Sequence, residues 1–314
     1  MSSRWEPRRI AVLGAGAMGS LFGGLLAEGG LEVALIDVWQ DHIDEINNNG
    51  LKITGEGGDR FVQLEASTNP AEIGEVDVVL VQTKARSTEE AVRAAGCLFA
   101  DHTVAISFQN GLGNEDVIAE IVGRDRVLGG VTAQGSAILG PGIIRNAGNL
   151  PSQIGELAGG ISDRVKRIAE VFTAAGLETV ASEDIMKDIW KKLLANIGIN
   201  AMSALCNFRV GEIFDVPETK ETILEAVDEA VLVARAAGVD IDSNETKQLL
   251  FKITGKGGTG SNRSGMLVDV LNKKRTEIDF INGAVVKLGK KYGIPTPVNE
   301  TLTAAVKGLE RNFR

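Results

Sequence analysis

The sequence is poor in the side chains that most often carry metal or nucleophilic chemistry. Its 314 residues include two cysteines and two histidines. Cys97 and Cys206 lie in unrelated apolar contexts without the spacing of metal ligands, so we expect buried thiols in a reducing compartment and no metal site. His42 lies in a polar segment and His102 follows an acid in an expected turn. Neither has a partner suited to a relay, so acid–base chemistry must use another residue type.

Long apolar runs and basic tracts are also missing. No stretch approaches the length of a membrane span, and residues 1–9 lead into the first expected strand without a signal-peptide core. The formal charge of −9 argues against a nucleic-acid partner, because no basic tract offsets it. We therefore expect a cytoplasmic protein that binds neither membranes nor nucleic acid.

Strand patterns alternate with helical patterns through the first half of the chain. Main strands are expected over 10–14, 33–37, 76–84, 103–111 and 127–133, and two edge strands within 140–157. Amphipathic helices then follow over 188–205, 221–238 and 276–293, with a mobile Gly-rich loop at 253–265. The predicted fold class is α/β, with an N-terminal Rossmann-type doubly wound sheet over 1–183 and an all-α C-terminal domain over 184–314.

The first expected strand runs directly into a glycine-rich turn. Gly14 permits the tight turn, Gly16 lets the main chain approach a pyrophosphate, and Gly19 lets the next helix pack closely. Phosphates would then lie at a helix N-terminus, where unpaired N–H groups favour anions. A plain structural turn is the alternative, but the flanking strand and helix favour a dinucleotide site. The residues that would form it are Gly14, Ala15, Gly16, Ala17, Met18 and Gly19.

Asp37 ends the second expected strand, eighteen residues after Gly19. A carboxylate here accepts hydrogen bonds from the adenosine ribose hydroxyls and repels a 2′-phosphate. The sequence therefore favours NAD(H) over NADP(H). The alternative is a solvated loop acid that happens to follow a strand.

A polar stripe interrupts the apolar helix expected over 188–205. Lys192, Asn196 and Asn200 are spaced i, i+4, i+8, which predicts one helix face. Because burying these groups without partners is costly, the stripe must face water or a cavity. A solvated face is the alternative, but asparagine is a poor helix former and occurs twice. If the stripe lines a cleft between the domains, Lys192 is the natural proton donor to a ketone oxygen.

Three further polar residues lie at expected element ends. Lys84 ends the strand over 76–84, and Asn110 lies in a Gly-rich turn where its amide can contact nicotinamide or substrate. Glu277 lies at the start of the late helix, where the helix dipole would stabilise a first-turn carboxylate. Asp279 fits that description equally, and each of these residues is also common in ordinary loops.

These motifs give the chain a resemblance to the ketopantoate reductases (2-dehydropantoate 2-reductases). It spans nearly the whole length and is carried by GAGAMGS, TKA, QNGLGNED, GVTAQGSAILGPGIIRNAG, IWKKLLANIGINAMSAL and RTEIDFINGAVVKLGKKYG. The resemblance implies reduction of the C2 ketone of 2-dehydropantoate to (R)-pantoate for pantothenate synthesis, with NADP(H) as the family's usual cofactor and a homodimer. It also implies roles for Lys192 as general acid, Glu277 as ligand of a substrate hydroxyl, Asn110, Asn196 and Asn200 around substrate and nicotinamide, and Lys84 at cofactor or substrate.

Two positions depart from the family pattern. The family usually has an Arg for the 2′-phosphate of NADPH where this chain has Asp37, and a substrate-binding Ser where it has Gly265. Ser264, one residue earlier, would take over that role after a loop adjustment. Both departures resemble the NAD-dependent D-2-hydroxyacid (D-mandelate type) dehydrogenases. Three interpretations stay open: a ketopantoate reductase using NADH, a relative that reduces another branched or bulky 2-keto acid, and a non-catalytic dinucleotide sensor, against which Lys192 speaks.

Overall fold

The computed structural model describes residues 5–255 and 258–313. The chain forms two compact units. The first holds the chain up to Gln109 together with Asn114–Met186, and the second holds Asn110–Gly113 together with the chain from Lys187 onward. The predicted domain boundary at 183/184 stays a prediction. Within the described ranges, no helix is both long and apolar enough to cross a membrane.

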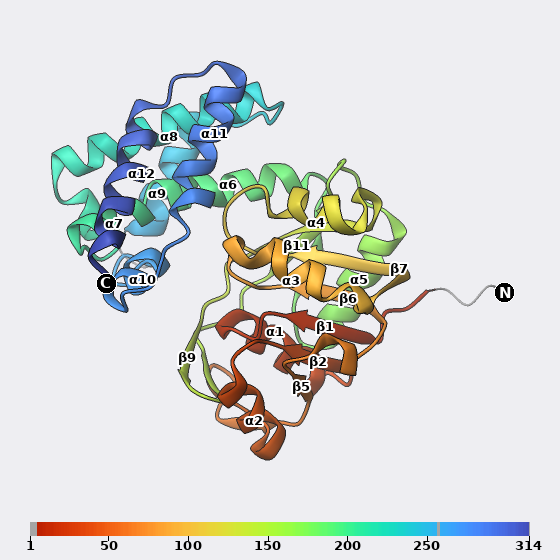
Figure 1. The fold of residues 1–314 in the computed structure, drawn as a ribbon. Coiled ribbons are helices and arrows are strands. Elements are labelled where there is room, and N and C mark those ends of the chain that lie inside the picture. Colours follow the sequence, from red (N-terminus) through yellow and green to blue (C-terminus); the bar gives the residue numbers. More distant parts are fainter. Residues whose placement is uncertain (1–4, 256–257, 314) are drawn as a thin grey trace. The chain divides into compact units, whose positions relative to one another are not determined.

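An eight-stranded sheet forms the centre of the first unit, in the order β12-β11-β8-β7-β6-β1-β2-β5 (Figure 1). From β5 to β8 all neighbours are parallel, whereas β11 runs antiparallel to β8. The order of these six parallel strands is that of a doubly wound dinucleotide-binding sheet, so the predicted fold class is confirmed. The strands are β1 (Arg9–Leu13), β2 (Glu32–Ile36), β5 (Glu65–Ser67), β6 (Val76–Val81), β7 (Phe99–Ser107), β8 (Val127–Thr132), β11 (Ser152–Glu156) and β12 (Thr179–Ala181).

Helices cover both faces of this sheet, because alternate side chains of each strand point to opposite sides. Ile10 and Val12 belong to a core shared with α1 (Ala17–Glu28) and α5 (Asp163–Ala174). Ala11 belongs to the opposite core, which includes residues of α3 (Thr88–Ala94) and α4 (Asn114–Val122). Strands buried on both faces explain the nearly continuous apolar runs of the sequence.

A second sheet, in the order β4-β3-β10-β9, was not expected from the sequence. Its strands are β3 (Leu51–Gly55), β4 (Arg60–Val62), β9 (Ser136–Gly140) and β10 (Ile143–Asn146), and α2 (Gln40–Asn49) precedes it. The prediction of two edge strands within 140–157 is wrong, because β10 lies between β3 and β9, and β11 between β8 and β12. Neither β9 nor β12 was recognised, since β9 is largely exposed and β12 has only three residues.

The second unit is helical over its described residues. Its helices are α6 (Ile185–Ile197, which begins two residues earlier in the first unit), α7 (Asn200–Cys206), α8 (Pro217–Ala236), α9 (Ser243–Thr254), α10 (Gly265–Leu271), α11 (Asn282–Tyr292) and α12 (Pro297–Glu310). α11 ends at Gly293, whose φ of +69° forms a left-handed cap. Of the predicted Gly-rich loop, 258–264 lie in turns and irregular chain, and 256–257 lie outside the described residues.

The thiols lie differently from expectation. Cys97 is exposed and Cys206 is half-buried, so the prediction of two buried cysteines is wrong. Cys97 belongs to a short 3-10 helix, Gly96–Leu98, in which Leu98 is the buried residue. An apolar neighbourhood in sequence therefore did not place the sulfur inside.

Candidate active site

The glycine turn lies at the carboxyl edge of the main sheet. Leu13 of β1 is in register with Ile36 of β2 and Val81 of β6, so the three strands end at one level. Gly14 and Asp37 directly follow β1 and β2. The strand order reverses between β1 and β6, and open α/β sheets bind ligands at such a point.

Two glycines of the turn, Gly14 and Gly19, have a steric reason for their positions. Gly14 has a φ of +102°, and a Cβ there would lie 2.6 Å from the Thr83 nitrogen. A Cβ on Gly19 would collide with the Gly14 carbonyl oxygen, whereas a Cβ on Gly16 would meet nothing within 4 Å. α1 begins at Ala17 with no side-chain cap and no acidic residue in its first turn. Open space before uncapped N–H groups fits a pyrophosphate.

Asp37 is half-buried at the end of β2. Its Oδ1 accepts a hydrogen bond from the Trp39 backbone N–H at 3.0 Å, and its own N–H donates to the Ser67 carbonyl at 3.3 Å. This Asx turn fixes the carboxylate at the carboxyl edge. The position suits ribose hydroxyls, which donate hydrogen bonds, and disfavours a phosphate.

His42 is fully buried on α2, contrary to the expectation from its polar sequence context. Its Nδ1 accepts the Gly142 N–H at 2.9 Å, and its Nε2 lies 3.1 Å from Ser20 Oγ. The view that His42 lacks a suitable partner is therefore wrong. Burial lowers the pKa of His42. This effect outweighs the nearby Asp37 carboxylate and the Ala15 backbone, which both raise the pKa. One signal was overlooked: His42 shares the buried face of α2 with Ile43 and Ile46, at i, i+1 and i+4.

Gln109 is a second residue that sequence reasoning missed. Its side chain is buried at the end of β7, and Nε2 donates to the Thr83 carbonyl and to Thr88 Oγ1, both at 2.7 Å. These bonds tie the segments that follow β6 and β7 together, next to Gly14. Lys84 follows β6 as an exposed residue before the 3-10 helix Ala85–Ser87.

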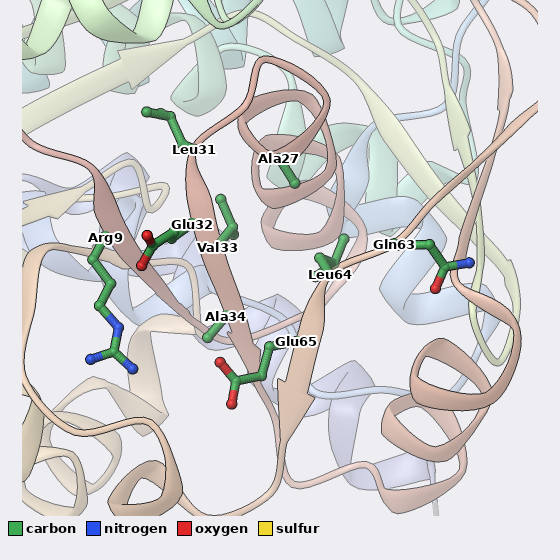
Figure 2. A pocket seen from close by; sticks show the side chains of 9 residues that line it. All are labelled: Arg9, Ala27, Leu31, Glu32, Val33, Ala34, Gln63, Leu64 and Glu65. Atoms are coloured by element: carbon green, nitrogen blue, oxygen red, sulfur yellow. The ribbon is translucent and has the colours of Figure 1, made fainter.

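A pocket of about 310 Å³ lies at the opposite edge of the sheet (Figure 2). Arg9, Glu32 and Glu65, at the starts of β1, β2 and β5, are among its nine lining residues. Two carboxylates in one small pocket disfavour a pyrophosphate. The carboxyl edge is therefore the candidate location for a dinucleotide.

Lys192 and Asn196 lie one turn apart on α6, as predicted. Both are half-buried, whereas Lys191 is exposed and Leu193 and Leu194 are buried. The two polar side chains therefore share a face that is neither fully exposed nor part of the apolar core.

Asn200 does not continue this helix. α6 ends at Ile197, Gly198 and Ile199 form a turn, and Asn200 is the first residue of α7. A Cβ on Gly198 would lie 2.9 Å from Leu250 Cδ1, so a close contact accompanies the turn. The prediction of one continuous helix over 188–205 is therefore wrong. The prediction that Asn200 shares a helix face with Lys192 and Asn196 is wrong for the same reason.

Two segments that carry predicted site residues meet in the second unit. The Leu112 N–H donates to the Phe280 carbonyl at 2.9 Å, which brings the segment of Asn110 next to that of Glu277. Glu277 is half-buried and precedes the 3-10 helix Ile278–Phe280, whereas α11 begins only at Asn282. The explanation of Glu277 by the dipole of the late helix is therefore wrong.

Ser264 caps α10. Its buried hydroxyl accepts the Leu267 N–H at 3.1 Å and donates to Ser203 Oγ at 3.0 Å. These bonds give the hydroxyl a structural function, and its predicted contact with substrate stays a prediction. Gly265 is exposed, and a Cβ there would meet nothing within 4 Å.

Known proteins resemble both parts of the chain. Residues 10–159 match the ketopantoate reductase PanE/ApbA family, and residues 184–310 match the ketopantoate reductase PanE/ApbA C-terminal family. The 2-dehydropantoate 2-reductase of Halobacterium salinarum is 34% identical over 305 residues, which are 97% of this chain and 99% of that protein. The 2-dehydropantoate 2-reductase of Pyrococcus abyssi is 36% identical over 302 residues, 96% of this chain and 98% of its own length.

Solved structures also resemble this chain over nearly its whole length. D-mandelate dehydrogenase with NADH and anilino(oxo)acetate has a TM-score of 0.92 at 29% identity, and 97% of this chain and 99% of that chain are covered. A PanE/ApbA family ketopantoate reductase from Ralstonia eutropha JMP134 has a TM-score of 0.90 at 29% identity, with the same coverage. The chain therefore belongs to the ketopantoate reductase family, whose members are NAD(P)-dependent oxidoreductases.

Proposed function

We propose that the protein reduces the C2 ketone of 2-dehydropantoate to (R)-pantoate and uses NADH. The observation that carries the proposal is the extent of the similarity. Relatives named 2-dehydropantoate 2-reductase are 34% and 36% identical over nearly the whole chain, including the helical part that holds Lys192 and Glu277. A sensor that only bound the dinucleotide would not need a proton donor.

In the proposed reaction the bound nicotinamide supplies a hydride to C2 of the keto acid. Lys192 Nζ holds the ketone oxygen by a hydrogen bond and donates a proton to it, so the ketone becomes an alcohol. Glu277 accepts a hydrogen bond from the substrate hydroxyl, and the amides of Asn110, Asn196 and Asn200 orient substrate and nicotinamide. Lys192 is then reprotonated from solvent.

The preference for NADH rests on Asp37. Its carboxylate is held at the end of β2 by the Trp39 N–H, where it can accept the ribose hydroxyls and would repel a 2′-phosphate. The glycine turn, residues 14–19, would hold the pyrophosphate, and Lys84 would contact cofactor or substrate. The homodimer implied by the family resemblance stays a prediction.

A second candidate is the reduction of another bulky 2-keto acid to a D-2-hydroxy acid. Two observations favour it: the TM-score of 0.92 to D-mandelate dehydrogenase with NADH, and Gly265 in place of the family's substrate-binding Ser. Gly265 removes one ligand that 2-dehydropantoate would need. Glu277 speaks for the first candidate, because its carboxylate suits the hydroxyl of 2-dehydropantoate.

The experiment measures steady-state kinetics of the protein and of Lys192→Ala, with Lys191→Ala as the matched control. Loss of a general acid should lower kcat by at least about 100-fold and leave NADH binding nearly unchanged. The exposed Lys191, one residue away on α6, should tolerate the same change. A Lys192→Ala protein with normal turnover contradicts the proposed mechanism.

Substrate identity is tested in the same assay with 2-dehydropantoate, 2-ketoisovalerate and benzoylformate, each with NADH and NADPH. 2-Ketoisovalerate lacks the hydroxymethyl group of 2-dehydropantoate. Glu277→Gln should therefore lower kcat/KM for 2-dehydropantoate and leave that for 2-ketoisovalerate nearly unchanged. The second candidate would be favoured if Glu277→Gln lowered kcat/KM equally for 2-dehydropantoate and 2-ketoisovalerate. A kcat/KM of the parent protein that is higher for benzoylformate than for 2-dehydropantoate would also favour it.

A further inference from the structure

A one-directional chain of hydrogen bonds leads from the second sheet to the glycine turn. The Gly142 N–H donates to His42 Nδ1, so this nitrogen carries a lone pair and the neutral ring has its proton on Nε2. That N–H donates to Ser20 Oγ at 3.1 Å, and the Ser20 hydroxyl donates to the Ala15 carbonyl at 2.8 Å. His42 and Ser20 are both fully buried.

The last hydrogen bond of the series, from Ser20 to the Ala15 carbonyl, fixes one peptide of the glycine turn. In a trans peptide the C=O and the following N–H point in opposite directions. Because the Ala15 carbonyl points at Ser20, the Gly16 N–H points the other way. The space beside Gly16 is open, since a Cβ there would meet nothing within 4 Å. The orientation of an anion-binding N–H is therefore set from behind by buried side chains.

Gly142, the first donor in this series of hydrogen bonds, is itself held in place. Gly142 lies in the turn between β9 and β10, and its carbonyl accepts the Lys52 N–H from β3 at 2.8 Å. The Trp39 ring stacks on the His42 ring, with centroids 4.9 Å apart and an interplanar angle of 11°. The Trp39 N–H in turn holds the Asp37 carboxylate. One imidazole therefore supports both the glycine turn and the acid at the end of β2.

We propose that His42 is a positioning residue for dinucleotide binding, which acts through Ser20 to direct the Gly16 N–H toward the pyrophosphate. The inference rests on the dinucleotide site proposed above. His42 itself is fully buried, so it would act without touching the dinucleotide. Its contribution is to keep the Ala15–Gly16 peptide in one orientation before the dinucleotide arrives.

Two substitutions separate the two bonds of the ring. In His42→Asn the amide oxygen takes the place of Nδ1 and keeps the bond from Gly142, but the side chain does not reach Ser20. In His42→Gln the amide nitrogen takes the place of Nε2 and keeps the bond to Ser20. We expect His42→Asn to weaken NADH binding by on the order of tenfold, the effect of one lost buried hydrogen bond, and His42→Gln to retain most of the affinity. His102→Asn, at the other histidine, is the matched control and should bind NADH like the parent.

The experiment combines NADH titration with nitrogen NMR of the ring. In a His102→Asn protein, His42 is the one remaining histidine, and its ¹⁵N shifts report which nitrogen carries the proton. We expect a deprotonated Nδ1 and a protonated Nε2, with and without NADH. Should His42→Asn fail to fold, Ser20→Ala removes the last link of the same chain and should give the same loss of affinity. The double variant should lose no more than either single variant.

The outcomes separate this inference from the proposed function. A proton on Nδ1, or equal NADH affinity of the parent, His42→Asn and Ser20→Ala, overturns the positioning role and leaves the dinucleotide site intact. Equal weakening by Asn and Gln also overturns it, because general disruption of packing would affect both. A parent protein that binds neither NADH nor NADPH overturns both proposals.

Discussion

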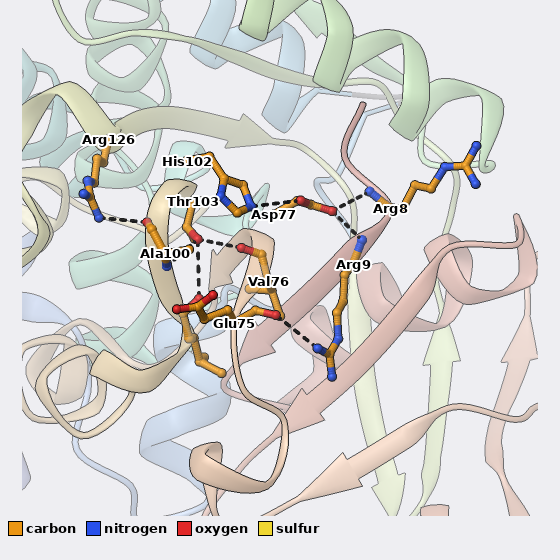
Figure 3. Close-up of polar contacts among 10 residues, drawn as sticks. Arg8, Arg9, Glu75, Val76, Asp77, Ala100, His102, Thr103 and Arg126 are labelled. Atoms are coloured by element: carbon orange, nitrogen blue, oxygen red, sulfur yellow. Dashed lines mark hydrogen bonds and ion pairs between the residues drawn. The ribbon is translucent and has the colours of Figure 1, made fainter. Parts of the chain in front are cut away.

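The two edges of the main sheet differ in whether side chains occupy the main-chain N–H groups that flank β1. At the amino edge, charged groups join neighbouring strands (Figure 3). The Asp77 carboxylate accepts the N–H groups of Arg8 and Arg9, both at 2.9 Å, and lies 3.2 Å from His102 Nε2. Here a carboxylate occupies two main-chain donors, which are no longer available to a ligand, and the side chains of Arg9 and Thr103 donate to the carbonyls of Glu75 and Val76.

At the carboxyl edge, two neutral side chains hold main-chain carbonyls, and Asp37 accepts the Trp39 N–H. Ser20 donates to the Ala15 carbonyl and Gln109 to the Thr83 carbonyl, while the first N–H groups of α1 have no side-chain cap. The difference is informative, because a side chain occupies the N–H groups at the start of β1 and none caps those at the start of α1. An anion is therefore expected at the start of α1, and the bonds at the start of β1 are expected to contribute to stability.

The largest expected effect concerns the glycines of the two edges. Gly14→Ala combines a φ of +102° with a Cβ 2.6 Å from the Thr83 nitrogen. Backbone strain and overpacking together should lower the free energy of unfolding by roughly 3 kcal/mol or more and abolish NADH binding. Urea unfolding and fluorescence titration with NADH measure the two quantities.

Gly30→Ala is the matched control at the amino edge. Gly30 has a φ of +88°, just before β2, but a Cβ there would meet nothing within 4 Å. Only the strain should remain, about 1 kcal/mol, with unchanged NADH affinity. If both variants lost the same stability and both bound NADH, the turn at Gly14 would be an ordinary turn.

The second effect concerns the two ends of β2. Asp37→Arg replaces a carboxylate that repels a 2′-phosphate by a guanidinium that can bind it. We expect the ratio of kcat/KM for NADPH over NADH to rise by roughly ten- to a hundredfold, the equivalent of about 1–3 kcal/mol. Steady-state kinetics with both cofactors at a fixed keto acid concentration give this ratio.

Glu32→Arg makes the same change of charge at the start of the same strand. Glu32 is exposed at the amino edge. Its substitution should leave the cofactor ratio unchanged, because it alters net charge without reaching the ribose. An equal rise in both variants would mean that the overall field, and not contact with Asp37, sets the preference.

The features of the site that sequence predicted well are those set by local backbone requirements. Gly14 and Gly19 are glycines because a Cβ would collide with the chain, and Asp37 follows a buried strand at the expected separation. Such requirements act over a few residues, so spacing reveals them. The i, i+4 pair of Lys192 and Asn196 is of the same kind.

What the sequence did not reveal depends on contacts between distant segments. The helix break after Ile197 accompanies a contact of Gly198 with Leu250, and the bond of His42 to Gly142 joins residues one hundred positions apart. The small second sheet also pairs β3 with β10 across a long separation. No local pattern encodes these partners, so a polar histidine or a continuous helix was the natural interpretation.

The smallest expected effect concerns the pH dependence of stability. Burial lowers the pKa of His42, against the opposing influence of Asp37 and of the Ala15 backbone. The unfolded chain therefore binds a proton near the ordinary histidine pKa of about 6.5 while the folded protein does not, and the free energy of unfolding falls as pH drops below this value. We expect the cofactor-free His102→Gln protein to lose urea stability between about pH 7 and 5.5. Adding His42→Gln should reduce that loss.

In this pH range the titration of a histidine is measured apart from that of the carboxylates, whose ordinary pKa values are near 4. Burial alone would raise the pKa of Glu156, but hydrogen bonds from Arg164 and Ser162 outweigh it and lower the pKa, so Glu156 stays charged throughout. Equal losses in the two proteins would mean that His42 takes up a proton as readily in the folded as in the unfolded chain. The Gly142 N–H would then not keep the folded ring in its neutral form, and the view of His42 as a neutral, fixed support of the carboxyl edge would fail.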